Sequence, residues 1–298
     1  MSSWLVGDLD TELFERLAAG LGGSELQSLL LEVMRRRALA RAPSAVLAQY
    51  QRDRFTSPAP IDQRISHAID TELLAAAASF AAIELSPVTP LGTCSTVAVT
   101  DQHRVLSALR GTEVVSDPTN VLALECAQRM RTASGPHHFA TSQRVVRAQP
   151  VPDKPGFAQH FRIFVLASGG LETRDHGFTC ETLAHHIRTL LAGFDRLEHH
   201  GYAFGARRVD ILATPARAEL GDRIAASLPG AVARKPLEHA YYSGGLRYML
   251  WVTTLDGEEV PIGDGGTFDW LAKLTSNRRA VYVASGMGAQ LVAIRFRK

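Results

Sequence analysis

Apolar and polar residues alternate along two neighbouring segments in the middle of the chain, 144–149 and 161–165. A period of two predicts half-buried strands, and the stretch from Pro150 to Gly156, which is rich in proline, predicts a turn between them. We therefore expect a β-hairpin that carries Arg147 on its inner face. Guanidinium suits anion binding because its planar fork matches anionic oxygens. The pattern by itself is nevertheless more typical of a solvated arginine on an ordinary hairpin.

Helical spacing of apolar residues dominates the first sixty positions. The spacing predicts helices at 10–19, 24–41 and 44–52, with glycines between the first two as a stop signal and Ser44 as the cap of the third. Proline and serine mark 56–60 as a linker. We therefore expect residues 1–60 to form a helical N-terminal extension and residues 61–298 to form the core domain.

Helices and strands are mixed after residue 61. The pattern predicts helices at 66–81, 121–131, 182–199, 217–227 and 269–274, and strands outside the hairpin at 83–87, 96–100, 105–109, 209–213, 246–253, 259–262 and 281–284. Strands dominate the middle and the end of the chain, and short loops join most of them. This order is typical of an α+β fold built around an antiparallel sheet, not of a doubly wound sheet.

Composition and charge narrow the range of functions. A chain of 298 residues has ample core, and its net charge of +2 argues against a general polyanion binder. The three cysteines have no CxxC spacing, so neither a disulfide framework nor a zinc site is predicted. No apolar run approaches membrane-spanning length and the N-terminus does not read as a signal peptide, so we expect a cytoplasmic protein with no membrane partner.

The order of motifs in the core resembles class II aminoacyl-tRNA synthetases. A helix leading into a strand that ends at Pro87 resembles their motif 1, Arg147 in its hairpin resembles the arginine of motif 2, and Gly-Met-Gly at 286–288 resembles the glycine turn of motif 3. Within that class the resemblance is strongest to histidyl-tRNA synthetase and to the regulatory subunit of ATP phosphoribosyltransferase. It rests on Tyr-Tyr-Ser-Gly at 241–244, Gly-Gly-Thr-Phe-Asp at 265–269 and Asp-Pro-Thr at 117–119.

The resemblance covers residues 62–296 by motif order and implies a six- or seven-stranded antiparallel sheet flanked by helices. It implies a homodimer formed through the region between Ser66 and Pro87, ATP with Mg²⁺ as cofactor, and a pocket for a small amino-acid-like ligand. Carried over with the hairpin histidine added, the candidate site comprises Arg147 and His160 as catalytic residues, Arg147, Gln149, Gly286 and Gly288 as cofactor-binding residues, and Asp117, Thr119, Tyr241, Tyr242, Gly265 and Gly266 as substrate-binding residues.

Several positions depart from the family pattern, and most of the departures remove a charge that the family uses. The residues standing in those places are Val115, Gln149, Leu237 (with Lys235 the nearest cation), Thr267, and Ala289, Gln290 and Leu291 after the motif 3 turn. Each cation lost from an adenylation site would remove on the order of 2–4 kcal/mol of transition-state stabilisation. We therefore do not expect a tRNA synthetase. We also expect no anticodon-binding domain and no tRNA partner.

Histidines, cysteines and glycines suggest three weaker sites. The histidine pairs at 137–138, 185–186 and 199–200 are adjacent in sequence, and helical neighbours point about 100° apart, so no metal site is predicted. Cys94 would need a base such as His160 to act as a nucleophile, and a buried thiol is the simpler interpretation. The glycine run at 263–266 lacks the lysine of a P-loop, so we interpret it as a pocket wall.

Two functions are carried forward. The first is a catalytically degenerate synthetase-like paralogue that binds a small amino-acid-like ligand, or a partner protein, as a regulatory or accessory homodimer. The second is an ATP-dependent ligase that adenylates a small carboxylate and passes it to an acceptor other than tRNA, with Arg147 leading and the lost charge replaced by Arg110, Arg144, Arg162 or Arg247. A nucleic-acid binder that uses the arginines at 35–41 is a weaker third. The missing cations favour the first function.

Overall fold

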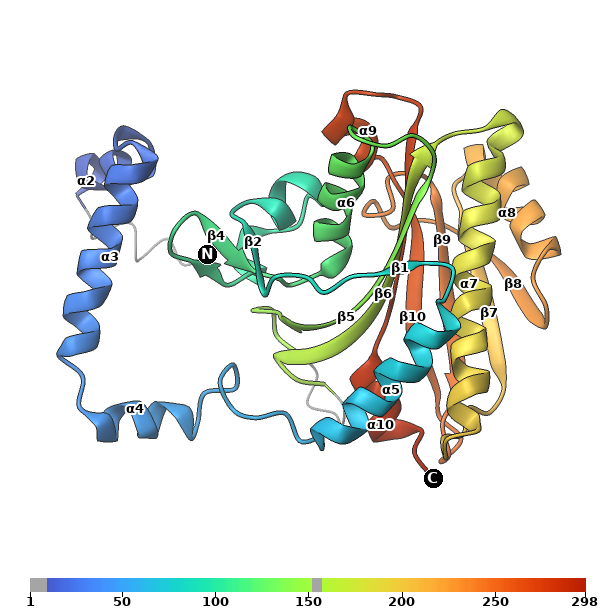
Figure 1. Ribbon diagram of the computed structural model, residues 1–298, viewed down its shortest axis with the longest axis horizontal. Helices are drawn as coiled ribbons and strands as arrows, with labels where there is room; N and C mark the ends of the chain where they lie inside the picture. Colours follow the sequence, from blue (N-terminus) through green and yellow to red (C-terminus); the bar gives the residue numbers. More distant parts are fainter. Residues whose placement is uncertain (1–9, 152–156) are drawn as a thin grey trace.

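The computed structural model describes residues 10–151 and 157–298, and it has an α+β core built on a large mixed sheet (Figure 1). Eight strands form this sheet in the order β1-β5-β6-β11-β10-β9-β7-β8. Their bounds, in that order, are Ala81–Ala82, His137–Val146, His160–Leu171, Ala280–Met287, Glu259–Phe268, Leu246–Thr253, Arg207–Ala213 and Ala231–Pro236. A second, small sheet contains β2 (Val88–Pro90), β4 (Thr112–Val114) and β3 (Ser107–Ala108).

Helices cover both faces of the large sheet. One face packs against α5 (Gln63–Ala76), α7 (Gly177–Glu198), α8 (Ala218–Ala226) and α10 (Ala289–Arg295), and the other packs against α6 (Pro118–Arg129) and α9 (Trp270–Thr275). Each face has its own apolar layer, centred on Ile187 for the first and on Tyr282 for the second. The candidate site opens on the α6 face. Within the described ranges, no helix has both the length and the apolar character needed to cross a membrane.

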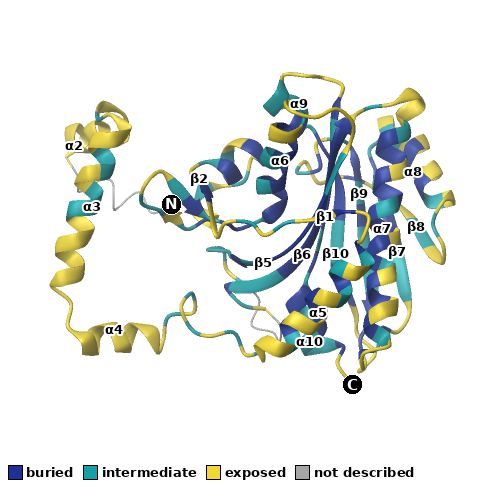
Figure 2. Cartoon of the chain, viewed as in Figure 1, coloured by how far each residue is buried: buried dark blue, intermediate teal, exposed yellow. Residues whose placement is uncertain are grey.

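The N-terminal helices stand apart from this core as an arm, made of α2 (Thr11–Glu15), η1 (Arg16–Gly20), α3 (Gly23–Leu39) and α4 (Pro43–Tyr50). None of these residues is buried (Figure 2). The helical character of the extension is as predicted, but Ser44 is not the cap of the third helix. That helix is capped at Ala42 and begins with Pro43, because proline's fixed φ and missing N–H suit a first helical turn.

The segment 93–97, which overlaps the strand predicted at 96–100, is a π-helical turn. The carboxylate of Glu113, only 1% exposed, accepts hydrogen bonds from the backbone N–H groups of Gly92 and Cys94, each at 2.8 Å. Because of those hydrogen bonds, the chain curves around the carboxylate and does not adopt an extended conformation. The predicted strand at 83–87 is likewise replaced by the two-residue β1, after which the chain leaves for the small sheet.

The predicted antiparallel sheet of six or seven strands has eight, and both of its edges are parallel pairs, β1 with β5 and β7 with β8. The strand predicted at 259–262 continues as β10 through the glycine run to Phe268. A Cβ on Gly265 would overlap the side chain of Ser285 and the carbonyl of Ala284, so glycine lets β10 and β11 approach closely. The glycine run that we interpreted as a pocket wall is therefore part of a strand. The helix α10, which follows β11, was not predicted.

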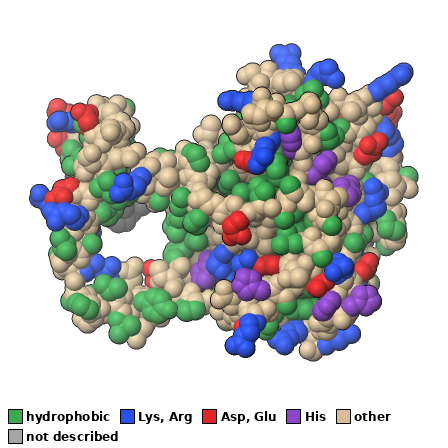
Figure 3. All heavy atoms as spheres, in the orientation of Figure 1, with side chains coloured by type: hydrophobic (Ala, Val, Ile, Leu, Met, Phe, Trp, Pro, Cys, Tyr) green, Lys and Arg blue, Asp and Glu red, His purple; other side chains and the backbone are tan. Residues whose placement is uncertain are grey.

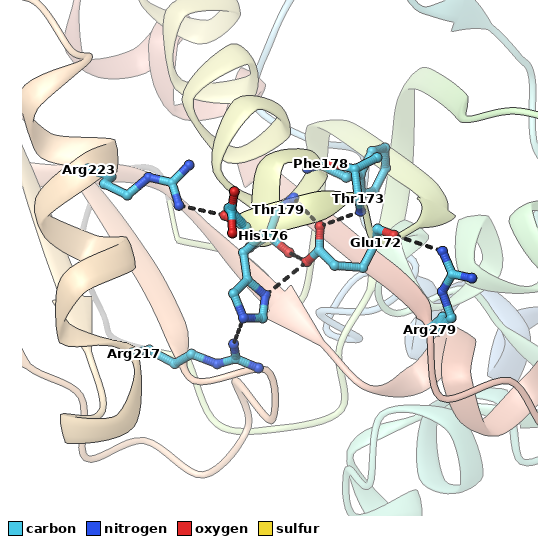
Figure 4. A network of polar contacts seen from close by, with 9 residues as sticks. Glu172, Thr173, His176, Phe178, Thr179, Arg217, Arg223 and Arg279 are labelled. Atoms are coloured by element: carbon cyan, nitrogen blue, oxygen red, sulfur yellow. Dashed lines mark hydrogen bonds and ion pairs between the residues drawn. The ribbon is translucent and has the colours of Figure 1, made fainter.

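The longest helix, α7, begins at a polar junction (Figure 4). Glu172 accepts hydrogen bonds from the backbone N–H groups of Thr173 at 3.0 Å and of Thr179 at 3.3 Å, and its carboxylate lies 3.3 Å from His176 Nδ1. His176 has a φ of 55°, which turns the chain from β6 into the helix. Although burial opposes it, the hydrogen bonds from Thr179 keep the pKa of Glu172 below its usual value. An ionised carboxylate there stabilises the helix start.

His186 on α7 is fully buried, and it should make the protein sensitive to mild acid. Its Nε2 lies 2.8 Å from Ser168 Oγ and its Nδ1 lies 2.9 Å from Ser285 Oγ. Burial lowers the pKa of His186 well below 6.5, and His185 and His138 nearby lower it further. As pH falls below 6.5, His186 therefore binds a proton in the unfolded chain but not in the folded chain. The contribution of neutral His186 to stability is complete above that pH and is lost below it.

We expect His186 to make the free energy of unfolding fall as the pH drops below 6.5, with a slope that approaches about 1.36 kcal/mol per pH unit. Urea unfolding at a series of pH values measures this slope. His186→Gln should flatten it, whereas His199→Gln, at the exposed end of α7, should leave it unchanged. Equal slopes for wild type and His186→Gln would contradict the assignment.

Candidate functional site

A cavity of about 430 Å³ lies between the β5–β6 hairpin, the centre of β9, β10 and β11, and the loop that carries Tyr241 and Tyr242. This size is typical of pockets that hold small molecules. The cavity belongs to the α6 face of the sheet, because Tyr242, Phe268 and Ala284 line it and also belong to that apolar layer. Glycines on β10 and β11 leave room where larger side chains would fill the space.

Arg147 follows β5 directly and lines the cavity. Its backbone N–H donates to the carbonyl of Gln159 at 2.8 Å, which closes the hairpin. The guanidinium carbon lies 5.0 Å from the centroid of Phe161, and Nε donates to the carbonyl of Ser116 at 3.1 Å. Its Nη2 is 3.8 Å from the carboxylate of Asp117, a loose ion pair. The guanidinium is thus held flat on an aromatic ring with one edge directed at Asp117.

Asp117 and Thr119 reach the cavity through the start of α6. Asp117 is the N-cap of α6, and its Oδ1 accepts from Thr119 N at 3.0 Å and from Thr119 Oγ1 at 2.8 Å. An aspartate at this position satisfies helix N–H groups that would otherwise lack partners. The other oxygen, Oδ2, is the one nearest Arg147. Capping therefore fixes a carboxylate at the cavity wall, as the Asp-x-Thr pattern predicted.

A second charged pair lies across the cavity. Asp264 on β10 accepts a hydrogen bond from Arg247 Nη2 on β9 at 2.8 Å and another from the hydroxyl of Tyr242. The guanidinium of Arg247 also lies 4.8 Å from the centroid of the Tyr242 ring. Burial and the Asp264 carboxylate raise the pKa of Tyr242, so its hydroxyl remains a donor. The three side chains hold one another in place.

Aromatic rings form the wall behind these charges. Tyr241, Tyr242 and Phe268 all line the cavity, and their ring centroids lie 5.3–5.4 Å apart. Trp270 packs behind Phe268 with centroids 4.0 Å apart. Burial and the carboxylate of Asp117 raise the pKa of Tyr241 well above its usual value. The wall is therefore rigid, apolar in body and edged with neutral hydroxyl groups.

Gln290 contributes an unusual polar atom. It opens α10 just after the motif 3-like turn, lines the cavity and is 3% exposed. Within residues 10–151 and 157–298, its buried side-chain oxygen has no hydrogen-bond partner. A buried acceptor left without a donor costs free energy, about 1–3 kcal/mol. A ligand that carries an N–H or O–H donor would relieve that cost.

The structure gathers nine of the sequence-predicted site residues around this cavity: Asp117, Thr119, Arg147, Gln149, Tyr241, Tyr242, Gly265, Gly286 and Gly288. Gly266 lies just behind the wall, where a Cβ would meet the ring of Tyr242. His160 does not line the cavity. Its Nδ1 is 3.0 Å from Arg144 Nη1 and its Nε2 is 2.7 Å from the carbonyl of Ser57, so both ring nitrogens are engaged elsewhere. The roles assigned to these residues stay predictions.

Cys94 is not placed to act with His160. It is buried, its Sγ accepts from Ser116 Oγ at 3.5 Å, and burial raises the pKa of its thiol. This environment is that of a structural thiol rather than a nucleophile. Within the described parts of the chain, no group of three or more His, Cys, Asp or Glu residues could hold a metal ion.

The cations proposed to replace the missing ones are placed differently from one another. Arg247 and Arg162 line the cavity, whereas Arg110 and Arg144 do not, and neither does Lys235, the cation nearest to Leu237 in the sequence. The guanidinium of Arg162 is turned to Asp70, with Nε 2.6 Å from the carboxylate, and Lys235 pairs with Asp210 at 2.6 Å.

The residues missed from sequence are Asp264, as a carboxylate that lines the cavity, and Phe161, Phe268 and Gln290 as cavity walls. The sequence signal that could have identified Asp264 was an acidic residue flanked by glycines.

Solved structures share this architecture. An ATP phosphoribosyltransferase regulatory subunit/histidyl-tRNA synthetase from Bacillus halodurans C superposes with a TM-score of 0.57 at 13% identity, over 80% of this chain and 81% of that chain. A histidine–tRNA ligase subunit from Alicyclobacillus acidocaldarius gives 0.58 at 12% identity, over 80% and 94%. The apo histidyl-tRNA synthetase of S. aureus gives 0.56 at 12% identity, over 81% and 68%.

These comparisons confirm the predicted fold. The chain has the class II synthetase-like α+β fold seen in histidyl-tRNA synthetases and in the regulatory subunit, with additional helices at its N-terminus. No family model matches the sequence, and no curated protein does.

Proposed function

We propose that this chain is a non-synthetase paralogue that binds a small amino-acid-like zwitterion in the cavity and acts as a regulatory or accessory subunit. One observation carries the proposal: each arginine at the cavity is already paired with a carboxylate. Arg147 faces Asp117, Arg247 is bound to Asp264, and Arg162 is bound to Asp70. A neutral set of alternating charges suits a ligand that carries one positive and one negative group.

The two pairs offer complementary contacts. The loose Arg147–Asp117 pair, at 3.8 Å, has room for a ligand carboxylate on the guanidinium and a ligand ammonium on the aspartate. The unpartnered oxygen of Gln290 can accept a further ligand N–H. The aromatic wall of Tyr241 and Phe268 suits a flat or apolar ligand side chain. Together these features favour a free amino acid or a close analogue.

The adenylating ligase is the second candidate, and Arg147, stacked on Phe161 and facing the cavity, favours it. Magnesium-bound ATP would bring about two net negative charges, which phosphate-binding sites meet with unpaired cations. At this cavity Arg247 and Arg162 are already neutralised, and the positions after the motif 3-like turn, where the resemblance expects a nucleotide-binding arginine, hold Ala289, Gln290 and Leu291. The residues present do not fit ATP with Mg²⁺, so we derive no adenylation step.

A homodimer through the region from Ser66 to Pro87 belongs to the same proposal. The strand in this region, β1, is at the edge of the large sheet, and both of its residues are exposed. An exposed strand edge leaves backbone groups available for pairing with another chain. A protein partner is also expected for a regulatory subunit.

Calorimetric titration with histidine and the other free amino acids, with and without ATP and Mg²⁺, tests the proposed ligand. We expect binding of one amino acid or a small group of them without ATP. Asp264→Asn should weaken that binding by about tenfold or more, because it removes a charge-assisted partner of Arg247 and Tyr242. Glu259→Gln, on the same strand but away from the cavity, is the matched control.

Other outcomes separate the two candidates. Micromolar binding of ATP, lost in Arg147→Ala, with pyrophosphate release when a carboxylate is added, would establish the ligase and overturn the proposal. If neither amino acids nor ATP bound, the proposed amino-acid site would also be wrong. A protein partner would then be the interpretation to test next.

A further inference from the structure

The arm formed by residues 11–50 carries an apolar stripe that the rest of the chain covers only in part, since Leu26 and Leu30 are half-buried and Val33 is exposed. On α3, Leu26, Leu30 and Val33 recur at helical spacing and lie on one face. Val33 is 41% exposed and the neighbouring Leu29 is 44% exposed. In proteins most of the stability of a helix comes from packing of its apolar face rather than from helix propensity. The stripe therefore needs a surface to pack against.

The arm meets its own core near both of its ends. Near the start of α3, a Cβ on Gly111, in the turn between β3 and β4, would lie 3.2 Å from Gln27 Nε2. At the linker, His160 Nε2 lies 2.7 Å from the carbonyl of Ser57. Between these points the space-filling view shows an opening between the arm and the core (Figure 3). The core of the same chain therefore leaves the stripe only partly covered.

Charge along the arm is segregated. Residues 10–32 hold five acids (Asp10, Glu12, Glu15, Glu25, Glu32) and one base (Arg16), a net charge of −4, and residues 33–50 hold Arg35, Arg36, Arg37 and Arg41, a net charge of +4. Because the sum is zero, the arm lacks the excess of cations that nucleic acid or an anionic membrane would select.

Part of this charge is satisfied locally. Glu32 accepts from Arg35 at 2.7 Å and from Arg36 at 2.8 Å. The segregation that remains rests on Glu12 and Glu15 at one end and on Arg37 and Arg41 at the other.

We propose that α3 is a homodimerisation element, in which the α3 helices of two copies of this chain pack antiparallel about a twofold axis. A twofold interface needs a surface that is complementary to itself. An apolar stripe with opposite charges at its two ends has this property when antiparallel, because each acidic end then lies beside the partner's basic end. A parallel pair would bring like charges together. This interface is separate from the one proposed for the core.

Single cysteines introduced into the full chain test the packing, since Cys94, Cys126 and Cys180 are all buried. Leu30→Cys, near the middle of the stripe, should form an intermolecular disulfide under mild oxidation. Ser28→Cys lies about 200° around the helix and should stay monomeric on a non-reducing gel. Because both cysteines lie on α3, the two variants report contact between α3 helices, whether or not the core also dimerises.

Stripe positions at the two ends report the direction of packing. A mixture of Leu26→Cys and Arg37→Cys should cross-link, whereas either variant alone should not, because antiparallel helices bring opposite ends together. Equal cross-linking of Ser28→Cys and Leu30→Cys, or cross-linking of Leu26→Cys with itself, would overturn the proposal.

Charge reversal gives a second, independent measurement by sedimentation. Arg37→Glu with Arg41→Glu makes an all-acidic arm, and Glu12→Lys with Glu15→Lys makes a basic one. Each should weaken association through the arm by about tenfold or more, and an equimolar mixture should restore that association between the two variants. Either double variant associating as tightly as wild type, or a mixture that stays dissociated, would show that something other than a second copy covers the arm.

Discussion

Gly266→Ala is expected to lower the free energy of unfolding by about 3 kcal/mol or more, the upper range for an overpacked core. Gly266 lies in β10, opposite Arg247 of β9 and Ala284 of β11. A Cβ there would overlap the carbonyl oxygen of Leu246 and the ring of Tyr242. The carbonyl is backbone and cannot move aside without disturbing the register of the sheet. Since Tyr242 lines the cavity, ligand binding should suffer as well.

Thermal unfolding measures the effect, and a loss of this size corresponds to a fall in Tm of roughly 6–12 °C. The control is Gly23→Ala at the start of α3, where an added Cβ has no heavy atom within 4 Å. That variant should match wild type or exceed it slightly, because alanine restricts the unfolded chain. Equal losses in the two variants would show that close strand approach is not the reason for the glycine.

Asp70→Ala is expected to cost about 3 kcal/mol, because it leaves the Arg162 guanidinium without its partner beneath the sheet. The carboxylate of Asp70 is 9% exposed, it lies 2.6 Å from Arg162 Nε, and it also accepts from Ser142 Oγ at 2.5 Å. Chemical denaturation reports the loss. The double variant Asp70→Leu/Arg162→Met should regain most of it, since removing both charges leaves neither buried alone.

Asp195→Ala provides the matched comparison. It removes an ion pair of the same 2.6 Å length, with Arg207, but the Asp195 side chain is 65% exposed. Exposed pairs contribute about 0–1 kcal/mol because water screens them. A cost for Asp195→Ala as large as that for Asp70→Ala would mean that burial is not what makes the Asp70–Arg162 pair valuable.

The sequence by itself determined the fold class, the hairpin with Arg147, and part of the cavity wall. The strand predicted at 246–253 is β9 to the residue, and the helix read from its Asp-Pro-Thr start is α6 with Asp117 as its N-cap. These features follow from local periodicity and capping, which need no knowledge of distant neighbours. Nine of the site residues proposed from motif order lie around the one cavity, although their chemical roles stay predictions.

Tertiary structure alone decided how the charges pair and where the chain departs from its local pattern. Nothing in the sequence assigns Asp264 to Arg247 and Tyr242, because the fold brings together residues that are 17 and 22 positions apart in the chain. The segment 96–100 looks extended, yet the buried carboxylate of Glu113 draws the chain before it into a turn. His160 looked catalytic on the hairpin, but packing of the linker engages it at Ser57. Long-range contacts set burial and charge pairing, and these decide what a cavity can bind.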